Sequence, residues 1–178
     1  LDDLAASARA RQGDYQVVTW MGDIPEEHFA AYGPLLTQLE LDDPHEDAVF
    51  EAPGYPPERL AYLNQRYRES RRTGITAVAI TPDGTMVGNS ELVWSTSDDD
   101  PVIEQENTLV MPAHRGHGLG LAMKVATHRA IAELAPAKRI VRTWNNEIND
   151  FMVGINEALG YRPASRDLCF QGPTPAAG

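Results

Sequence analysis

The feature that most constrains the fold is a glycine-rich turn that leads from a strand pattern into a long helix pattern. The stretch LVMPAHRGHGLGLAMK, residues 109–124, carries three glycines on alternate positions just before the helix. From Leu119 to Leu134 apolar residues recur every three or four positions, and Pro136 is expected to stop the helix. A strand joined to a helix in this way is one unit of an α/β fold, and the full order of predicted elements given below indicates a mixed sheet.

The same turn predicts a binding site for an anion. The first N–H groups of a helix are unpaired and lie at the positive end of its dipole, and glycines allow close approach to the main chain. Arg115 can add charge-assisted hydrogen bonds to such a ligand, and phosphate is the natural candidate. The spacing of Gly116, Gly118 and Gly120 excludes both the Walker loop and the Rossmann fingerprint. An ordinary helix start without a ligand is the alternative.

The charge distribution agrees with an anionic ligand at this turn. The net charge is −11 and the isoelectric point is near 4.8, so a general nucleic-acid binder is not expected. Between Asn107 and Asn146, however, the only acid is Glu133, against six basic residues: Arg115, Lys124, Arg129, Lys138, Arg139 and Arg142. An anion on this basic segment and a cation elsewhere would suit the field, although chance clustering on a solvated surface gives the same pattern.

Length and composition indicate one globular domain without a membrane span. The 178 residues suit a single core, and no run approaches the ~20 apolar residues that a bilayer requires. No signal peptide is recognisable, which predicts a cytoplasmic protein. Cys169 is the only cysteine, so an internal disulfide and a cysteine-rich metal site are excluded. Because the chain starts at Leu1, we expect a fragment or one half of a longer polypeptide.

The periodicity predicts an ordered series of elements between a helical lead-in or linker at residues 1–14 and a disordered tail at residues 172–178. An acidic, proline-rich connection at residues 39–57 is long enough to be functional or mobile. The expected elements are a strand at 15–20, helices at 25–39 and 57–72, a hairpin at 75–94, strands at 102–110 and 139–144, a helix at 148–159, and a closing strand at 165–170.

Two motifs together resemble the GCN5-related N-acetyltransferase (GNAT) superfamily. The first is R-x-x-G-x-G, formed by Arg115, Gly118 and Gly120, and the second is NDFMVGINEALGY, residues 149–161. The resemblance covers roughly residues 15–170 and is greatest to members that occur as tandem two-domain chains. It implies a mixed, mostly antiparallel central sheet flanked by helices, with residues 15–171 forming a GNAT acyltransferase domain.

This resemblance also implies a reaction and a set of binding residues. In the family, an amine attacks the thioester of acetyl-CoA directly, so a primary amine of a small molecule or peptide is the expected acceptor. The family pattern implies that the following residues bind coenzyme A: the main chain of Leu109 and Val110, Arg115, the amides of Gly116, His117, Gly118, Leu119 and Gly120, and the side chains of Asn149 and Asn156. His114 is a further candidate contact.

Glu104 and Glu106 are the candidates for the general base. An alkylammonium with a pKa near ~10.4 is protonated at neutral pH, so attack needs a proton acceptor. Both glutamates lie on the strand before the turn and are expected to share one face with Thr108 and Val110. The spacing from Glu104 to Arg115 resembles that of several relatives, which favours Glu104. Two solvent-facing acids are the alternative interpretation.

One departure from the family leaves two rival functions open. Many members carry a tyrosine as general acid seven residues after the motif asparagine, where this chain has Asn156. A thiol with a pKa near ~8.5 leaves tolerably without an acid, so transfer remains possible. A catalytically silent acyl-CoA-binding domain that supports a partner or tandem domain is the first alternative. A domain that binds an acidic partner protein without coenzyme A is the second.

Other acidic residues carry weaker expectations. The segment from Glu40 to Glu51 is placed to meet a cationic amine, on charge alone. Asp98, Asp99 and Asp100 could in principle hold a metal ion, but a solvated turn is favoured, so no metal is expected. Neither nucleic acid nor a membrane is an expected partner.

Overall fold

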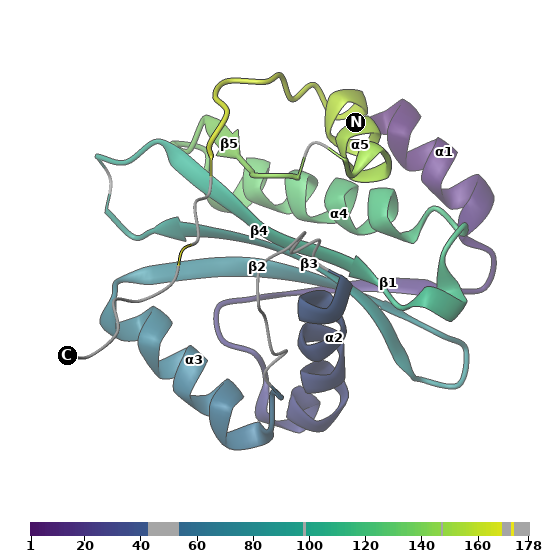
Figure 1. The fold of residues 1–178 in the computed structure, drawn as a ribbon, viewed down its shortest axis with the longest axis horizontal. Helices are drawn as coiled ribbons and strands as arrows, with labels where there is room; N and C mark the ends of the chain where they lie inside the picture. Colours follow the sequence, from purple (N-terminus) through teal and green to yellow (C-terminus); the bar gives the residue numbers. More distant parts are fainter. Residues whose placement is uncertain (43–53, 98, 147, 169–171, 173–178) are drawn as a thin grey trace.

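The computed structural model describes residues 1–42, 54–97, 99–146, 148–168 and 172. The strands form one sheet in the order β1-β2-β3-β4-β5, in which β1 to β4 are antiparallel and β5 runs parallel to β4 (Figure 1). The strands are β1 (Gln16–Met21), β2 (Arg72–Ile80), β3 (Met86–Ser95), β4 (Val102–Val110) and β5 (Ile140–Arg142). The mixed, mostly antiparallel α/β sheet expected from the sequence is confirmed.

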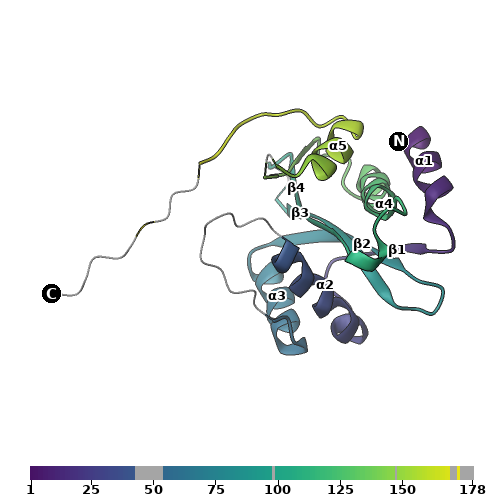
Figure 2. The same ribbon diagram turned by 45° about the vertical axis from the view of Figure 1, so that its right-hand side comes forward.

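Helices cover both faces of this sheet (Figures 1 and 2). On one face lie α2 (Phe29–Asp42) and α3 (Pro57–Glu69), and on the other lie α1 (Asp2–Gln12), α4 (Leu119–Leu134) and α5 (Asp150–Ala158). Short 3-10 turns at Glu26–His28 and Pro112–His114 precede α2 and α4. None of the described helices is both long and apolar enough to cross a membrane.

Alternating side chains of the sheet build a core on each face. Leu109 packs with Tyr32 and Leu36 on the α2–α3 side, whereas its neighbour Val110 packs with Leu119 and Met123 on the α4 side. This is the period-2 alternation of a strand that is buried on both faces. The sheet therefore has two separate sides on which functional residues can lie.

The N-terminal helix α1 packs closely on α4. Ala8 is 2% exposed and belongs to a cluster with Leu121, Ala122 and Val125 of α4. Because Ala8 has no polar atoms and little volume, the two helices can approach closely there. The segment predicted as a helical lead-in is thus helical, and it also covers part of the sheet's α4 side.

Most predicted elements are confirmed, although several of their bounds differ by a few residues and the closing strand is not found in the described residues. The hairpin, β4 and α4 lie where the periodicity placed them. The second predicted helix ends at Glu69, not at residue 72, because Arg71 adopts a positive φ of 54° and the chain turns into β2. In the described part of the predicted closing strand, residues 165–168 form no strand. Leu168 is 82% exposed there, so the segment lacks the packing that would hold a strand.

Several sequence-based expectations fall outside the described residues. These are Cys169, Asp98, most of the acidic segment at residues 43–51, and the tail at residues 173–178. Of the remaining aspartates in the predicted turn, Asp100 accepts a hydrogen bond from the backbone N–H of Val102 at 2.9 Å. Among the residues that the structure describes, no group of three or more His, Cys, Asp or Glu side chains could hold a metal ion.

A bulge in β4 and the short β5 shape the middle of the sheet. The register between β3 and β4 shifts where Glu91 pairs with Asn107 and Leu92 pairs with Gln105, so Glu106 is one extra residue. The pairing of β4 with β5 ends at Glu104. Beyond that residue, no described strand covers the outer edge of β4. The free edge of β4 therefore runs from the bulge to the glycine turn.

Candidate functional site

The glycine turn has the backbone geometry of an anion cradle. Gly116 and Gly118 have φ values of 85° and 68°, in the left-handed region that only glycine adopts without strain. Gly118 is the N-cap of α4, and its carbonyl accepts from Ala122 at 2.9 Å. In the described part of the chain, the N–H groups of residues 116–121 have no acceptor. A Cβ on Gly116 would meet nothing within 4 Å, so the turn opens to the outside.

Arg115, the predicted phosphate contact, is directed elsewhere. Its Nε donates to the carbonyl of Val110 at 3.0 Å, and its guanidinium forms an ion pair with Asp42 at the end of α2. The arginine thus joins the end of β4 to α2. An arginine can do both because its guanidinium carries five donors in a fixed plane.

Arg11 is a basic residue near the turn that the sequence interpretation missed. A Cβ built on Gly118 would lie 3.4 Å from Nε of Arg11, so this guanidinium reaches the glycine turn from α1. The sequence signal was present as the basic stretch ARARQ, but the helix was interpreted as a lead-in. Only the packing of α1 on α4 brings Arg11 to the turn.

The two histidines of the turn, His114 and His117, pack against Tyr15, the residue just before β1. The hydroxyl of Tyr15 is hydrogen-bonded to Nδ1 of His114 at 2.8 Å, and the rings of Tyr15 and His117 have centroids 5.2 Å apart. These contacts brace the turn against the start of the sheet. His117 itself remains exposed at the turn.

The free edge of β4 leads away from this cradle. The N–H of Met111 donates to the carbonyl of Val87 on β3, and the carbonyl of Leu109 also lies toward β3, 2.8 Å from a Cβ built on Gly88. Since backbone groups alternate along a strand, those of Val110 and Thr108 point to the free edge. Of the two residues that the resemblance assigned to pantetheine, the main chain of Val110 therefore faces outward.

Helices α4 and α5 flank the free edge. A Cβ on Gly120 would lie 3.5 Å from Cδ1 of Ile155 in α5 and 3.8 Å from Cγ2 of Thr108 in β4. The first turn of α4 is therefore close to both elements. An elongated ligand anchored at the glycine turn can follow the edge of β4 beside α4 and α5.

Glu104 and Glu106 do not share a face with Thr108 and Val110, as the sequence analysis expected. Thr108 lies on the α4 side, where its hydroxyl is hydrogen-bonded to that of Ser90 at 2.9 Å. Glu106 instead contacts Arg72, whose guanidinium lies over the ring of Tyr67 in α3. The bulge causes the difference, because one extra residue reverses the alternation along β4.

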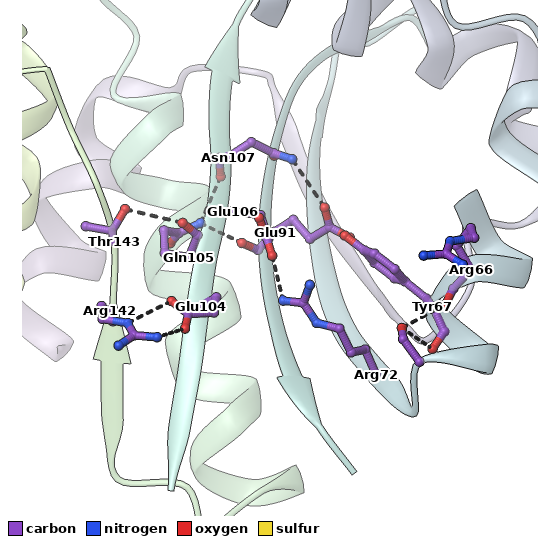
Figure 3. A network of polar contacts seen from close by, with 11 residues as sticks. Arg66, Tyr67, Arg72, Glu91, Glu104, Gln105, Glu106, Asn107, Arg142 and Thr143 are labelled. Atoms are coloured by element: carbon purple, nitrogen blue, oxygen red, sulfur yellow. Dashed lines mark hydrogen bonds and ion pairs between the residues drawn. The ribbon is translucent and has the colours of Figure 1, made fainter. Parts of the chain in front are cut away.

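Both glutamates are held in ion pairs (Figure 3). Glu104 accepts from Nη2 of Arg142 at 2.5 Å and from its Nε at 3.3 Å, across the β4–β5 pairing. Glu106 accepts from Arg72 at 2.7 Å. Glu104 thus fixes the short β5 strand, whereas Glu106 lies beside a third carboxylate.

That third carboxylate, Glu91, is a residue that the sequence interpretation missed. It lies in the middle of β3, on the α3 side, and its Oε2 accepts from Nδ2 of Asn107 at 3.2 Å. Burial raises the pKa of Glu91 to about 7, and the nearby charge of Glu106 adds to the effect, while Asn107 and Arg72 oppose it. An acid inside the apolar strand GNSELVW was the available signal. We call Glu91, Glu106, Arg72 and Asn107 the carboxylate cluster.

Two buried acceptor atoms near the bulge have no partner among the described residues, namely Oδ1 of Asn89 and Oε1 of Gln105. The amide nitrogens of both side chains are already used. Nδ2 of Asn89 donates to Asn107 at 2.7 Å, and Nε2 of Gln105 donates to the carbonyl of Glu91 at 2.7 Å. Unpaired buried acceptors are uncommon in folded proteins.

The two asparagines of the second motif have partners within the protein. Oδ1 of Asn149 accepts from the N–H of Met152 at 3.2 Å and caps α5. Asn156 is 5% exposed: its Oδ1 accepts from Nζ of Lys124 at 2.8 Å, and its Nδ2 donates to Oδ1 of Asn145 at 2.6 Å. The motif therefore connects α4, α5 and the segment between β5 and α5.

Comparison with known proteins gives matches at the level of structure. No protein-family profile matches the sequence, and no curated protein matches it either. A tandem GNAT protein from the clavulanic acid biosynthesis pathway superposes with a TM-score of 0.64 at 28% identity. The match covers 85% of this chain and 43% of that one, so the chain spans less than half of the tandem protein.

Two further solved structures match over nearly their full length. An acetyltransferase of Trypanosoma brucei has a TM-score of 0.63 at 22% identity, covering 89% of this chain and 99% of that one. The aminoglycoside acetyltransferase AAC(6')-Iy, in complex with a bisubstrate analogue of coenzyme A and acetylneamine, has a TM-score of 0.59 at 16% identity, with 88% and 99% covered. The fold, the R-x-x-G-x-G turn and these neighbours together place the chain in the GNAT superfamily.

Proposed function

We propose that this chain is an N-acetyltransferase that moves the acetyl group of acetyl-CoA to a primary amine. The observation that carries the proposal is the row of backbone N–H groups without an acceptor at residues 116–121, from which the free edge of β4 leads into the sheet. Such a row at a helix start suits a diphosphate. Structural neighbours of this chain include the aminoglycoside N-acetyltransferase AAC(6')-Iy solved with coenzyme A.

Binding divides between the turn and the strand. The amides of residues 116–120 and the guanidinium of Arg11 bind the diphosphate, and Arg115 holds the end of β4 in place through Val110 and Asp42. Backbone N–H groups on the free edge of β4 bind the carbonyls of the pantetheine arm. One of them polarises the acyl carbonyl, a form of stabilisation that is strong where water is excluded.

Glu91 is the proton acceptor in this proposal. A primary ammonium has a pKa near ~10.4, and a base is most effective when its own pKa lies near the working pH. The pKa of Glu91, raised to about 7 by burial and by Glu106, meets that condition. Glu106 tunes Glu91 and contacts the amine, while Glu104 remains paired with Arg142.

The acceptor is a small cationic molecule or a peptide amine. The carboxylate cluster lies on the α2–α3 side of the sheet, opposite the α4 side that carries the glycine turn. Carboxylates attract a substrate that carries several ammonium groups. The structural neighbours include the aminoglycoside acetyltransferases AAC(6')-Iy and AAC(6')-Ih, and aminoglycosides are cationic amines of this kind.

A catalytically silent acyl-CoA-binding domain is the second candidate function. Asn156 is the observation that favours it, because this residue occupies the position of the family's tyrosine and its amide is bonded to Lys124 and Asn145. Such a domain would bind acetyl-CoA as tightly but transfer nothing.

A transfer assay separates the two functions. The wild-type chain is mixed with acetyl-CoA and a panel of primary amines, aminoglycosides included, and thiol release and acetylated products are measured across pH. The proposal expects transfer with an acid limb near the pKa of Glu91, and a loss of about 100-fold or more in Glu91→Gln. Glu104→Gln serves as the matched control and keeps the acid limb. Binding of acetyl-CoA without transfer to any amine would contradict the N-acetyltransferase proposal and support the catalytically silent domain.

A further inference from the structure

Lys124 is a buried cation to which the described residues supply no anionic partner. It lies in α4, its side chain is 1% exposed, and its Nζ donates to Oδ1 of Asn156 at 2.8 Å. No described carboxylate forms an ion pair with it. An ammonium has three hydrogens, so two of them have no acceptor in the described part of the chain. A buried charge left in this state is costly and calls for a physical reason.

The groups around Lys124 do not neutralise it. From α4, the ring of His128 faces it and donates through Nδ1 to the Lys124 carbonyl at 2.7 Å; after α5, the ring of Tyr161 lies 5.8 Å from Nζ. Among the described residues of α5 and the segment before it, the neutral amide of Asn156 accepts from Lys124 and donates in turn to Oδ1 of Asn145. Burial lowers the pKa of the Lys124 ammonium to about 8. The lysine can therefore change its charge within a working pH range.

Lys124 lies on the face of α4 that the proposed path of acyl-CoA passes. It lies one helical turn after Gly120, whose surroundings are Thr108 of β4 and Ile155 of α5. Residues four apart lie on one face of a helix, so Lys124 belongs to the face of α4 that meets the free edge of β4 and α5. A ligand that starts at the glycine turn and follows β4 passes this face.

We propose that Lys124, held by Asn156, is the proton donor to the sulfur that leaves when the thioester is cleaved. The inference rests on the proposed function. The amine nitrogen forms a bond to the acyl carbon, the carbon–sulfur bond breaks, and its electron pair goes to sulfur. One ammonium hydrogen of Lys124 passes to that sulfur, which gives a neutral thiol and a neutral lysine amine. The proton of the attacking amine goes to Glu91.

The acid strengths of donor and acceptor are matched in this step. A free thiol has a pKa near ~8.5, and the pKa of Lys124 is lowered to about 8. Proton transfer between groups of similar acidity costs little in either direction. A cation beside the sulfur also lowers the pKa of the thiol, because it stabilises the thiolate.

The protonation of Lys124 can be followed directly by NMR, because Lys138 is the only other lysine in the chain. Protein labelled with 13C at the lysine ε carbon gives two signals, and Lys138→Arg assigns them. Both are titrated by NMR in the free protein, with coenzyme A, and with desulfo-coenzyme A, which lacks the sulfur. We expect the Lys124 signal to titrate at a higher pH with coenzyme A than with desulfo-coenzyme A, while Lys138 stays unchanged in both.

A second measurement follows the sulfur itself. The ultraviolet absorbance of the thiolate gives the pKa of the thiol of bound coenzyme A. It is expected to rise by about one unit or more in Lys124→Met, and to stay constant in the control Lys138→Met. Far-ultraviolet circular dichroism verifies that both variants are folded.

The outcomes separate this inference from the proposed function. If neither coenzyme A nor its desulfo analogue changes the protein's melting temperature, the proposed function fails. If both ligands bind but Lys124 titrates identically with each, and the bound thiol keeps its pKa in Lys124→Met, then Lys124 does not face the sulfur and this inference fails alone.

Discussion

Glu91 owes its role to its surroundings and not to its residue type. The same side chain on an exposed strand would be a solvated carboxylate, but here burial and Glu106 raise its pKa to about 7. Asn107 donates to it across the bulge and orients it. Because the pKa of Glu91 differs between the folded and unfolded states, this residue makes the free energy of unfolding depend on pH.

The first prediction concerns the stability of Glu91→Gln. The unfolded carboxyl loses its proton near pH ~4.3 and the folded one near 7, so the wild-type free energy of unfolding falls as pH rises between these values. Above pH 7 the loss of unfolding free energy is complete and amounts to at most about 4 kcal/mol. Glu91→Gln is therefore expected to be more stable than wild type at about pH 8, with a smaller difference at about pH 5.5. Urea unfolding measures both; an equal difference at the two pH values would contradict the account.

The second prediction concerns Arg11. A hydrogen bond to a charged group contributes about 1.5–3 kcal/mol, so Arg11→Gln should weaken acetyl-CoA binding about tenfold or more. Arg9→Gln is the matched control, because residues two apart on a helix point to different sides. Isothermal titration at low salt measures both affinities. Equal losses in the two variants would mean that net charge alone is responsible, with no specific contact from Arg11.

Residue roles were predictable from the sequence only where the backbone alone fixes them. The glycine turn needed no tertiary information, because three glycines before a helix define its backbone. Glu91 could not be found in this way, since its raised pKa depends on Glu106 and on burial under α3. The face of Glu106 was wrongly predicted because a bulge leaves no reliable mark in a single sequence.

At the scale of elements, β4 connects the two chemical sides of the sheet. Its pairing with β5 covers only three residue pairs, which leaves the edge from Gln105 to Val110 free. Its bulge turns Glu106 and Asn107 together toward α3. A regular strand would have divided these residues between the two faces. The irregularity therefore brings the carboxylate cluster together.

Helix α1 is an element whose importance only the structure reveals. It carries Arg11 to the glycine turn and packs through Ala8 on Leu121 and Val125 of α4. The sequence analysis expected a helical lead-in or a linker there, and its weakly apolar face gave no indication of a partner. Strands and helices with clear periodicity, such as β4 and α4, were predicted at their observed bounds.

The third prediction tests this packing. Ala8→Asp places a carboxylate in a 2% exposed contact and should cost at least about 2 kcal/mol of unfolding free energy. For a chain of this size, about 2 kcal/mol lowers the melting temperature by roughly 4–8 °C. The control is Ala6→Asp, because Ala6 is exposed on the same helix. If both variants melt alike, α1 does not depend on its contact with α4.

At the scale of the whole molecule, the sheet separates two electrostatic environments. The α4 side carries the glycine turn, Arg11 and Lys124, whereas the α2–α3 side carries Glu91 and Glu106. An overall charge of −11 hides this division. In the proposed function, an anionic donor bound on one side and a cationic acceptor bound on the other would meet at the bulge of β4.

The central claim is that acetyl-CoA binds through the glycine turn, and a thermal melt with and without acetyl-CoA tests it most directly. At ~100 times its dissociation constant, a ligand of the native state adds about 2.7 kcal/mol, or roughly 5–10 °C. Gly116→Asp and Gly116→Asn share one backbone requirement at a φ of 85°, and only the former adds a negative charge. We predict that wild type and Gly116→Asn are stabilised and that Gly116→Asp is not. No shift in wild type, or equal shifts in the two variants, would contradict the claim.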